Sequence, residues 1–171
     1  VATVGFATSA QAEPITSLPG GTSIVIPATE SFTAGPVTFG PGITYSSTID
    51  TSVFGYTGSY GFSSNGSWQG TPMIGLNAPN GSFTLDFASP IRAFLADTNW
   101  TTAESPAANA SLSAFDSLGN LLETLTLENN GANAVPIGFN GVRQPSFNIS
   151  RITFSNEDIG IRNILIDSGL V

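Results

Sequence analysis

The chain has 171 residues, of which 40% are hydrophobic and only 9% are charged, and its net charge is −8. This length fits one domain with a core of its own, and the excess of carboxylates argues against binding to nucleic acid or to anionic membranes. The sequence contains no histidine, cysteine or lysine, so the usual bases, nucleophiles and soft metal ligands of enzymes are missing. We therefore predict a protein that is not an enzyme.

The first twelve residues allow two interpretations. Ala10-Gln11-Ala12 before Glu13 is typical of a signal-peptidase site, preceded by the end of an apolar segment. Alternatively, these residues form a strand in which every second side chain faces one side. Both interpretations imply export, and the sequence contains no apolar stretch of transmembrane length. The side chains that would face together in this assembly strand belong to Ala2, Val4, Phe6, Thr8 and Ala10.

Short runs of β-branched and aromatic residues fill most of the chain, separated by glycine and proline. In several runs apolar and polar residues alternate, which is the pattern of a half-buried strand. We predict an all-β fold, a jelly-roll-like β-sandwich of about ten short antiparallel strands without significant helix. The sandwich would occupy residues 22–171, after an N-terminal arm at residues 1–21. The predicted strands are Ser23–Ile26, Val37–Phe39, Ile43–Ile49, Val53–Tyr56, Ser82–Phe87, Arg92–Asp97, Ala110–Phe115, Leu121–Leu127, Ile137–Phe139, Ile149–Asn156 and Ile159–Asp167.

Two stretches between the predicted strands are expected to be long loops, Gly55–Gly81 and Thr101–Asn109. Long loops at the end of a sandwich commonly carry binding sites, and aromatic rings can stack on the apolar faces of sugars. The rings in or beside these loops are therefore candidates for glycan binding, although the same rings could equally fill the core. They belong to Tyr56, Tyr60, Phe62, Trp68 and Trp100.

Other patterns point to chemistry only weakly. Asn156, Glu157 and Asp158 offer oxygen ligands for calcium, but turn formation explains the same residues. Asp97 and Glu104 on either side of Trp100 could be a glycosidase pair, but solvated loop acids are the simpler interpretation. Phe115–Leu121, with Asp116 and Gly119, predicts a hairpin, and Asp116 with Asn120 is a further calcium candidate. Five Asn-x-Ser/Thr sequences are weak glycosylation candidates: Asn65, Asn80, Asn99, Asn109 and Asn148.

The second half of the chain carries a resemblance. Ser82–Phe87, Ile91–Asp97, Leu112–Thr124, Ile149–Phe154 and Ile159–Ile164 together resemble the jelly-roll ectodomains of exported bacterial proteins, many of which carry a PEP-CTERM sorting tail. The resemblance implies secretion and a role in extracellular matrix or surface material. The sequence ends at Gly169-Leu170-Val171 without the Pro-Glu-Pro motif, apolar helix and basic end of such a tail.

These observations lead to one function and one alternative. We predict a secreted structural protein of the cell surface or biofilm matrix, a filament subunit whose partners are other copies of itself, joined through the N-terminal strand. The alternative is a secreted carbohydrate-binding module for extracellular polysaccharide. Neither function requires a cofactor, and calcium is the only one that the residues suggest.

Overall fold

The computed structural model describes residues 11–101, 109–127 and 137–169. Within these ranges the chain forms sixteen strands, all paired antiparallel, and one short 3₁₀ turn, η1 (Ser63–Asn65). The predicted all-β, jelly-roll-like sandwich is therefore confirmed. No helix in the described part of the chain is long and apolar enough to cross a membrane. The predicted assembly strand, Ala2–Ala10, and Glu104 lie outside the described residues.

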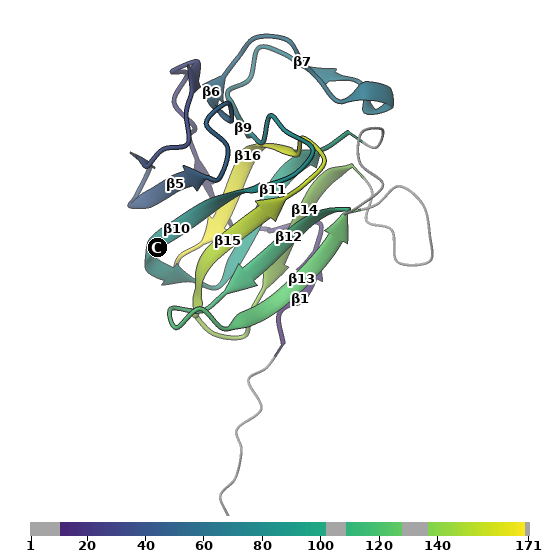
Figure 1. The fold of residues 1–171 in the computed structure, drawn as a ribbon. Coiled ribbons are helices and arrows are strands. Elements are labelled where there is room, and N and C mark those ends of the chain that lie inside the picture. Colours follow the sequence, from purple (N-terminus) through teal and green to yellow (C-terminus); the bar gives the residue numbers. More distant parts are fainter. Residues whose placement is uncertain (1–10, 102–108, 128–136, 170–171) are drawn as a thin grey trace, which may run out of the picture.

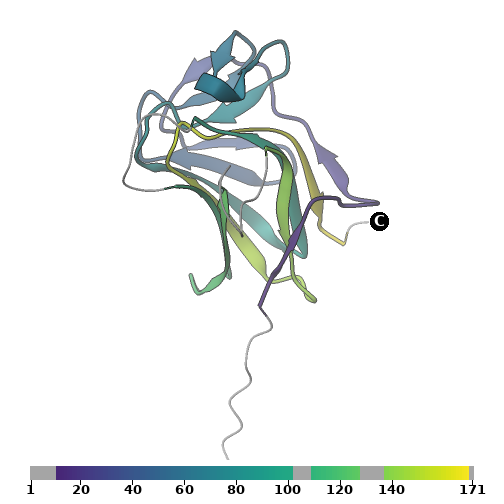
Figure 2. The ribbon, with the colours of Figure 1, turned by 90° about the vertical axis from the view of Figure 1, so that its right-hand side faces the viewer.

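Two sheets pack face to face, and a small hairpin lies at one end of them (Figures 1 and 2). In the first sheet the order is β1-β14-β11-β16-β9-β6-β3, with β2 also paired to β16, and in the second it is β13-β12-β15-β10-β5-β4. The first sheet consists of β1 (Glu13–Ile15), β2 (Thr22–Ile24), β3 (Ser31–Phe32), β6 (Val53–Tyr56), β9 (Met73–Gly75), β11 (Ala93–Asn99), β14 (Gly138–Arg143) and β16 (Gly160–Asp167). The second sheet consists of β4 (Val37–Phe39), β5 (Ile43–Ser47), β10 (Ser82–Ile91), β12 (Ala110–Phe115), β13 (Leu121–Leu127) and β15 (Ile149–Ser155). The separate hairpin consists of β7 (Tyr60–Gly61) and β8 (Ser67–Trp68).

The core between the sheets follows from the alternation in the strands. In β10, Phe83 and Leu85 are fully buried, while Thr84 between them is half-buried. Phe83 stacks on Phe154 of β15 with ring centroids 5.0 Å apart, and Phe94 of β11 approaches Phe154 from the opposite sheet at 5.9 Å. These aromatic contacts join the two sheets by burying apolar surface, which is the main source of stability in a chain without disulfides.

One lateral side of the sandwich, which we call the closed edge, is formed by β3 and β4. The chain passes there from the first sheet to the second through residues 33–36. The Tyr45 hydroxyl donates a hydrogen bond to the Thr33 carbonyl at 3.0 Å, and the Ser47 amide donates to the Ala34 carbonyl at 2.7 Å. The crossing segment is thus bonded to β5, which closes the gap between the sheets.

The opposite lateral side is formed by β1 and β13. Glu13–Ile15 pairs with β14 of the same molecule, as Figure 2 shows for the purple segment. The amide of Ala12 donates to the Leu122 carbonyl of β13 at 3.4 Å, and Leu18 packs on the outer side of β11 against Leu95. Residues 12–18 therefore belong to the sandwich, and the predicted boundary of the arm at residue 21 is wrong, because these apolar side chains find cover on their own molecule.

Candidate functional site

The predicted glycan-binding loop, Gly55–Gly81, forms ordered structure around a second small core. This stretch contains η1, β7, β8 and β9, and it lies over one end of the sandwich (Figure 1). The buried members of this core come from four different segments, with two tyrosines packed against them at its margin. They are Val53, Phe62, Trp68 and Met73, with Tyr56 and Tyr60 partly buried beside them.

Trp68 is a core residue here and offers no stacking surface. Its exposure is 8%, and the ring of Phe62 meets it edge-on at 4.9 Å between centroids. The guanidinium carbon of Arg162 lies 4.2 Å from the centre of the Trp68 ring, and the Nε of Arg162 is bonded to Asp97 at 2.8 Å. The predicted role of Trp68 in glycan binding is therefore wrong, because the protein itself covers the ring.

Trp100 is likewise unavailable to a ligand, since only 1% of its surface is exposed and it belongs to the main core. Asn99 at 3% exposure shares this burial, so its predicted glycosylation is also wrong. The Nδ2 of Asn99 donates to the Asn65 carbonyl, and the Nδ2 of Asn65 donates to the Trp100 carbonyl at 2.6 Å. Glycosylation at the exposed residues Asn80 and Asn109 and at the half-buried Asn65 and Asn148 stays a prediction.

Asn156, Glu157 and Asp158 form the turn between β15 and β16, with φ values of 67°, 56° and 46°. The amides of these three residues donate to carbonyls of the segment 78–81, and Thr101 donates from its amide and its hydroxyl to the Glu157 carbonyl. The turn is therefore hydrogen-bonded to two other segments at this end of the sandwich, residues 78–81 and Thr101. Among the described residues no group of three or more His, Cys, Asp or Glu could hold a metal ion, and calcium at this turn stays a prediction.

Among the described strands, β13 is the last one on this side of the second sheet, and we call its outer edge at Glu123–Leu127 the open edge. This segment pairs with β12 on one side, in register from Ala110 to Ala114. Along its other side, the bond from Ala12 to Leu122 is the only backbone hydrogen bond that the described residues make to β13. The open edge contains neither proline nor lysine, the residues that usually protect such an edge, and one carboxylate, that of Glu123.

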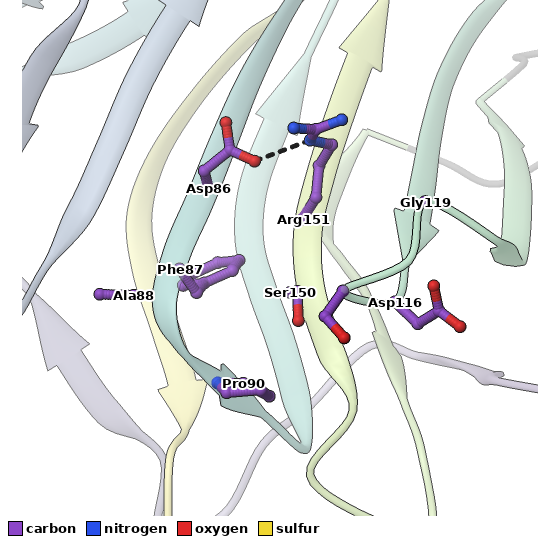
Figure 3. A pocket seen from close by; sticks show the side chains of 9 residues that line it. Asp86, Phe87, Ala88, Pro90, Asp116, Gly119, Ser150 and Arg151 are labelled. Carbon is purple, nitrogen blue, oxygen red and sulfur yellow. Dashed lines mark hydrogen bonds and ion pairs between the residues drawn. The ribbon is translucent and has the colours of Figure 1, made fainter.

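A pocket of about 280 Å³ lies on the second sheet between β10, β15 and the β12–β13 turn (Figure 3). It exists because the ladder between β10 and β15 is interrupted. Asp86 is the partner of Arg151 and Ile91 is the partner of Ile149, so residues 87–90 of β10 lie opposite Ser150 alone. The longer segment bows away from β15, and the turn at Asp116 closes the third side.

The polar groups of this pocket differ in how far the protein satisfies them. Arg151 donates from Nε to Asp86 at 2.7 Å. Asp116 accepts two backbone amides, of Leu118 and Asn120, and the side-chain amide of Asn120, and these bonds, with the Asn120 side chain first, lower the pKa of Asp116. The Oγ of Ser150 is buried and has no hydrogen-bond partner. The sequence contained no sign of this pocket, because it depends on the pairing of strands far apart in the chain.

Comparison with family models and comparison with curated proteins gave no match to this chain. Among solved structures, a fucose-binding module of Streptococcus pneumoniae, SpX-3, matches with a TM-score of 0.36 and 8% sequence identity. The match covers 55% of this chain and 70% of the module. A likeness at this level says nothing about what the present chain binds.

Proposed function

We propose that this protein is a non-enzymatic, secreted structural subunit whose N-terminal strand, Ala2–Ala10, adds to the open edge of a second copy. The observation that carries the proposal is the edge at Glu123–Leu127, which no second described strand covers and beside which the arm begins. Ala12 is bonded to Leu122 at the start of this edge, and Gln11 lies beside Leu121–Thr124 of the same strand. Extended segments commonly bind to an exposed sheet edge through backbone hydrogen bonds.

Donor and acceptor are different surfaces of one molecule, so the contact is head-to-tail and can repeat indefinitely. Burial of Val4 and Phe6 would contribute about 3–5 kcal/mol for each junction, in addition to the backbone bonds. The net charge of −8 on each subunit opposes association, and salt screens this repulsion. Assembly should therefore increase with ionic strength, as expected for subunits that meet outside the cell.

The arm could also fold back on its own β13, and cross-linking between copies separates the two arrangements. The chain has no cysteine, so single-cysteine variants are clean probes. We expect a mixture of Thr8→Cys and Thr126→Cys proteins to form a covalent dimer with a short bismaleimide linker, which tolerates a small shift in register. The matched control pairs Thr8→Cys with Thr38→Cys, because Thr38 is an exposed residue of β4 at the closed edge of the same sheet.

Two results would overturn the proposal. One is the absence of mixed dimers while a single chain carrying both cysteines links to itself. The other is a mature protein whose mass shows that it begins at Glu13, since cleavage after Ala12 would remove the donor strand. A deletion of residues 1–10 should leave a folded monomer, because Ala12 and β1 remain to pair with β13 and β14.

The alternative is a carbohydrate-binding module built on the aromatic loop. Both tryptophans that it would use, Trp68 and Trp100, are buried in the protein. Tyr56 and Tyr60 remain at the margin of the small core, and their rings meet edge-on at 6.3 Å. The Tyr60 hydroxyl donates to the Leu76 carbonyl at 3.3 Å. This arrangement gives no flat aromatic platform, and it favours the structural role over the aromatic-loop alternative.

A further inference from the structure

We infer that the pocket between β10, β15 and the β12–β13 turn binds a neutral, hydroxyl-rich ligand of the size of one sugar ring. This inference is independent of the proposed assembly, since the pocket shares no residue with the donor strand or the open edge. It also differs from glycan binding by the aromatic loop, because the pocket lies on the second sheet (Figure 3).

The first step is the unsatisfied hydroxyl of Ser150. Buried polar atoms nearly always have a hydrogen-bond partner, and one without a partner costs stability. Ser150 lies where both neighbouring ladders are interrupted: its β10 side faces the bowed residues 87–90, and the β12 ladder ends at the pair Phe115 and Arg151. Ser150 lines the pocket, so rotation of its side chain about χ1 would bring the buried Oγ to a ligand hydroxyl that supplies the missing partner.

The second step is the pairing of donors and acceptors around that hydroxyl. Arg151 uses Nε for Asp86, and its two terminal nitrogens make no hydrogen bond with the described residues. Asp86 accepts this bond on Oδ1 and keeps Oδ2 available. Ser117 adds a further hydroxyl at the turn. A sugar hydroxyl donates and accepts at once, so it suits a site that offers both functions.

The third step is the apolar side of the pocket together with its charge and size. Phe87, Ala88 and Pro90 supply carbon atoms against which the C–H face of a sugar can pack. Two carboxylates and one guanidinium leave the pocket with a formal charge of −1, which disfavours anions. Arg151 beside Asp86 disfavours a metal cation. The volume of about 280 Å³ lies just below the range of drug-sized ligand sites, roughly 300–1,000 Å³, which suits a ligand as small as one sugar ring.

Saturation-transfer NMR on the full chain tests the inference and does not require the protein to be monomeric. The probes are the methyl glycosides of glucose, galactose, mannose and fucose, each titrated to obtain a Kd. We expect saturation transfer to at least one glycoside. The Ser150→Ala variant should weaken it about tenfold, the equivalent of one lost hydrogen bond, and Arg151→Gln should weaken it as well. The matched control is Ser155→Ala, at the far end of β15 and outside the pocket.

A second readout separates a binding role of Ser150 from a structural one. Removal of an unsatisfied buried hydroxyl should leave the free protein as stable as the wild type or more stable, so Ser150→Ala would lose affinity without losing stability. The inference is overturned if none of the four glycosides shows saturation transfer, or if Ser150→Ala and the wild type bind with equal Kd. Either result leaves the assembly through β13 untouched, so the two proposals fail separately.

Discussion

The two lateral sides of the sandwich differ in how the chain connects the two sheets. At the closed edge, residues 33–36 cross between the sheets and bond to β5, and Phe54 packs beneath them against Tyr45 and Phe39. At the other side, the described residues connect the sheets through the backbone bond from Ala12 to Leu122. A sheet edge is a template for pairing with another chain. The comparison teaches that the chain itself crosses between the sheets at one side, whereas at the other side the described residues leave Glu123–Leu127 of β13 without a second partner strand.

At the closed edge, one backbone position can be occupied only by glycine. Gly55 in β6 has φ +67°, and a Cβ atom there would lie 2.1 Å from the Pro27 carbonyl oxygen and 2.6 Å from the Thr29 hydroxyl. No side chain fits this position, so the close approach of the segment before β3 to β6 depends on glycine. The bulge in the β6–β9 ladder between Phe54 and Tyr56 includes this residue. The open edge, Glu123–Leu127, contains no glycine.

The largest expected effect is at the core of the closed edge. Phe54→Ala should lower the free energy of unfolding by about 3–5 kcal/mol, because a fully buried ring between the sheets is replaced by a cavity. Urea denaturation followed by circular dichroism measures the change. The control is Phe32→Ala at the same edge, where the ring is 60% exposed and the loss should stay below about 1 kcal/mol. Equal losses in the two variants would contradict our account of this edge.

A somewhat smaller loss is expected for Gly55→Ala, about 2–3 kcal/mol, from the left-handed backbone together with the collision with Pro27. Gly70→Ala is the matched control, because Gly70 has φ +81° but a Cβ atom added there would meet no other atom within 4 Å, and it should cost only about 1 kcal/mol. Thermal unfolding of both variants gives the difference. If Gly70→Ala were as destabilising, backbone strain alone would explain both.

At the open edge we expect almost no change in stability but a large change in assembly. Thr126→Lys places a charge on an exposed position of β13, which should change the free energy of unfolding by less than about 0.5 kcal/mol and prevent strand addition. Sedimentation velocity at moderate salt measures the polymer. Thr38→Lys on β4 is the control and should assemble like the wild type. Polymers of undiminished length in Thr126→Lys would show that β13 is not the acceptor.

The smallest effect concerns the turn beside the open edge. Hydrogen bonds from Asn120, Leu118 and Gly119 lower the pKa of Asp116 below its ordinary value of 3.8. A lowered pKa means that the charged form stabilises the fold, and that this contribution is present above pH 3.8 and is lost as the pH falls through the lowered pKa. An NMR titration should show the amides of Leu118 and Asn120 shifting with a midpoint below 3.8. A midpoint at or above that value would contradict the bonding of this turn.

Several strands could be predicted with their bounds, because their residues alternate and turn residues flank them. Val37–Phe39, Val53–Tyr56, Ala110–Phe115 and Leu121–Leu127 begin and end in the structure where the sequence predicts. The Asp116 hairpin is also confirmed, since Asp116 bonds the amides of the following residues. These features are local: side-chain period and turn chemistry act over fewer than about ten residues.

The short strands β7, β8 and β9 were not predicted, because strands of two or three residues are too short to show alternation. Tyr60–Gly61 and Ser67–Trp68 have only two residues each, too few for a period, and they pair only with each other. The sequence could not show whether the rings of Trp68 and Trp100 are buried or exposed, because burial depends on side chains from distant parts of the chain that cover them. Arg162, which covers Trp68, comes from a strand almost at the end of the chain.

The sequence by itself determined that the chain is an all-β sandwich without the side chains that most enzymes use, since composition and local alternation suffice for both conclusions. The tertiary structure alone decided which edge is closed, which rings are buried and where a pocket opens. The pocket shows the reason: the extra residues of β10 opposite Ser150 appear only when β10 and β15, about 65 residues apart, are set in register. Register between distant strands is a property of the packed sandwich, and no short stretch of sequence contains it.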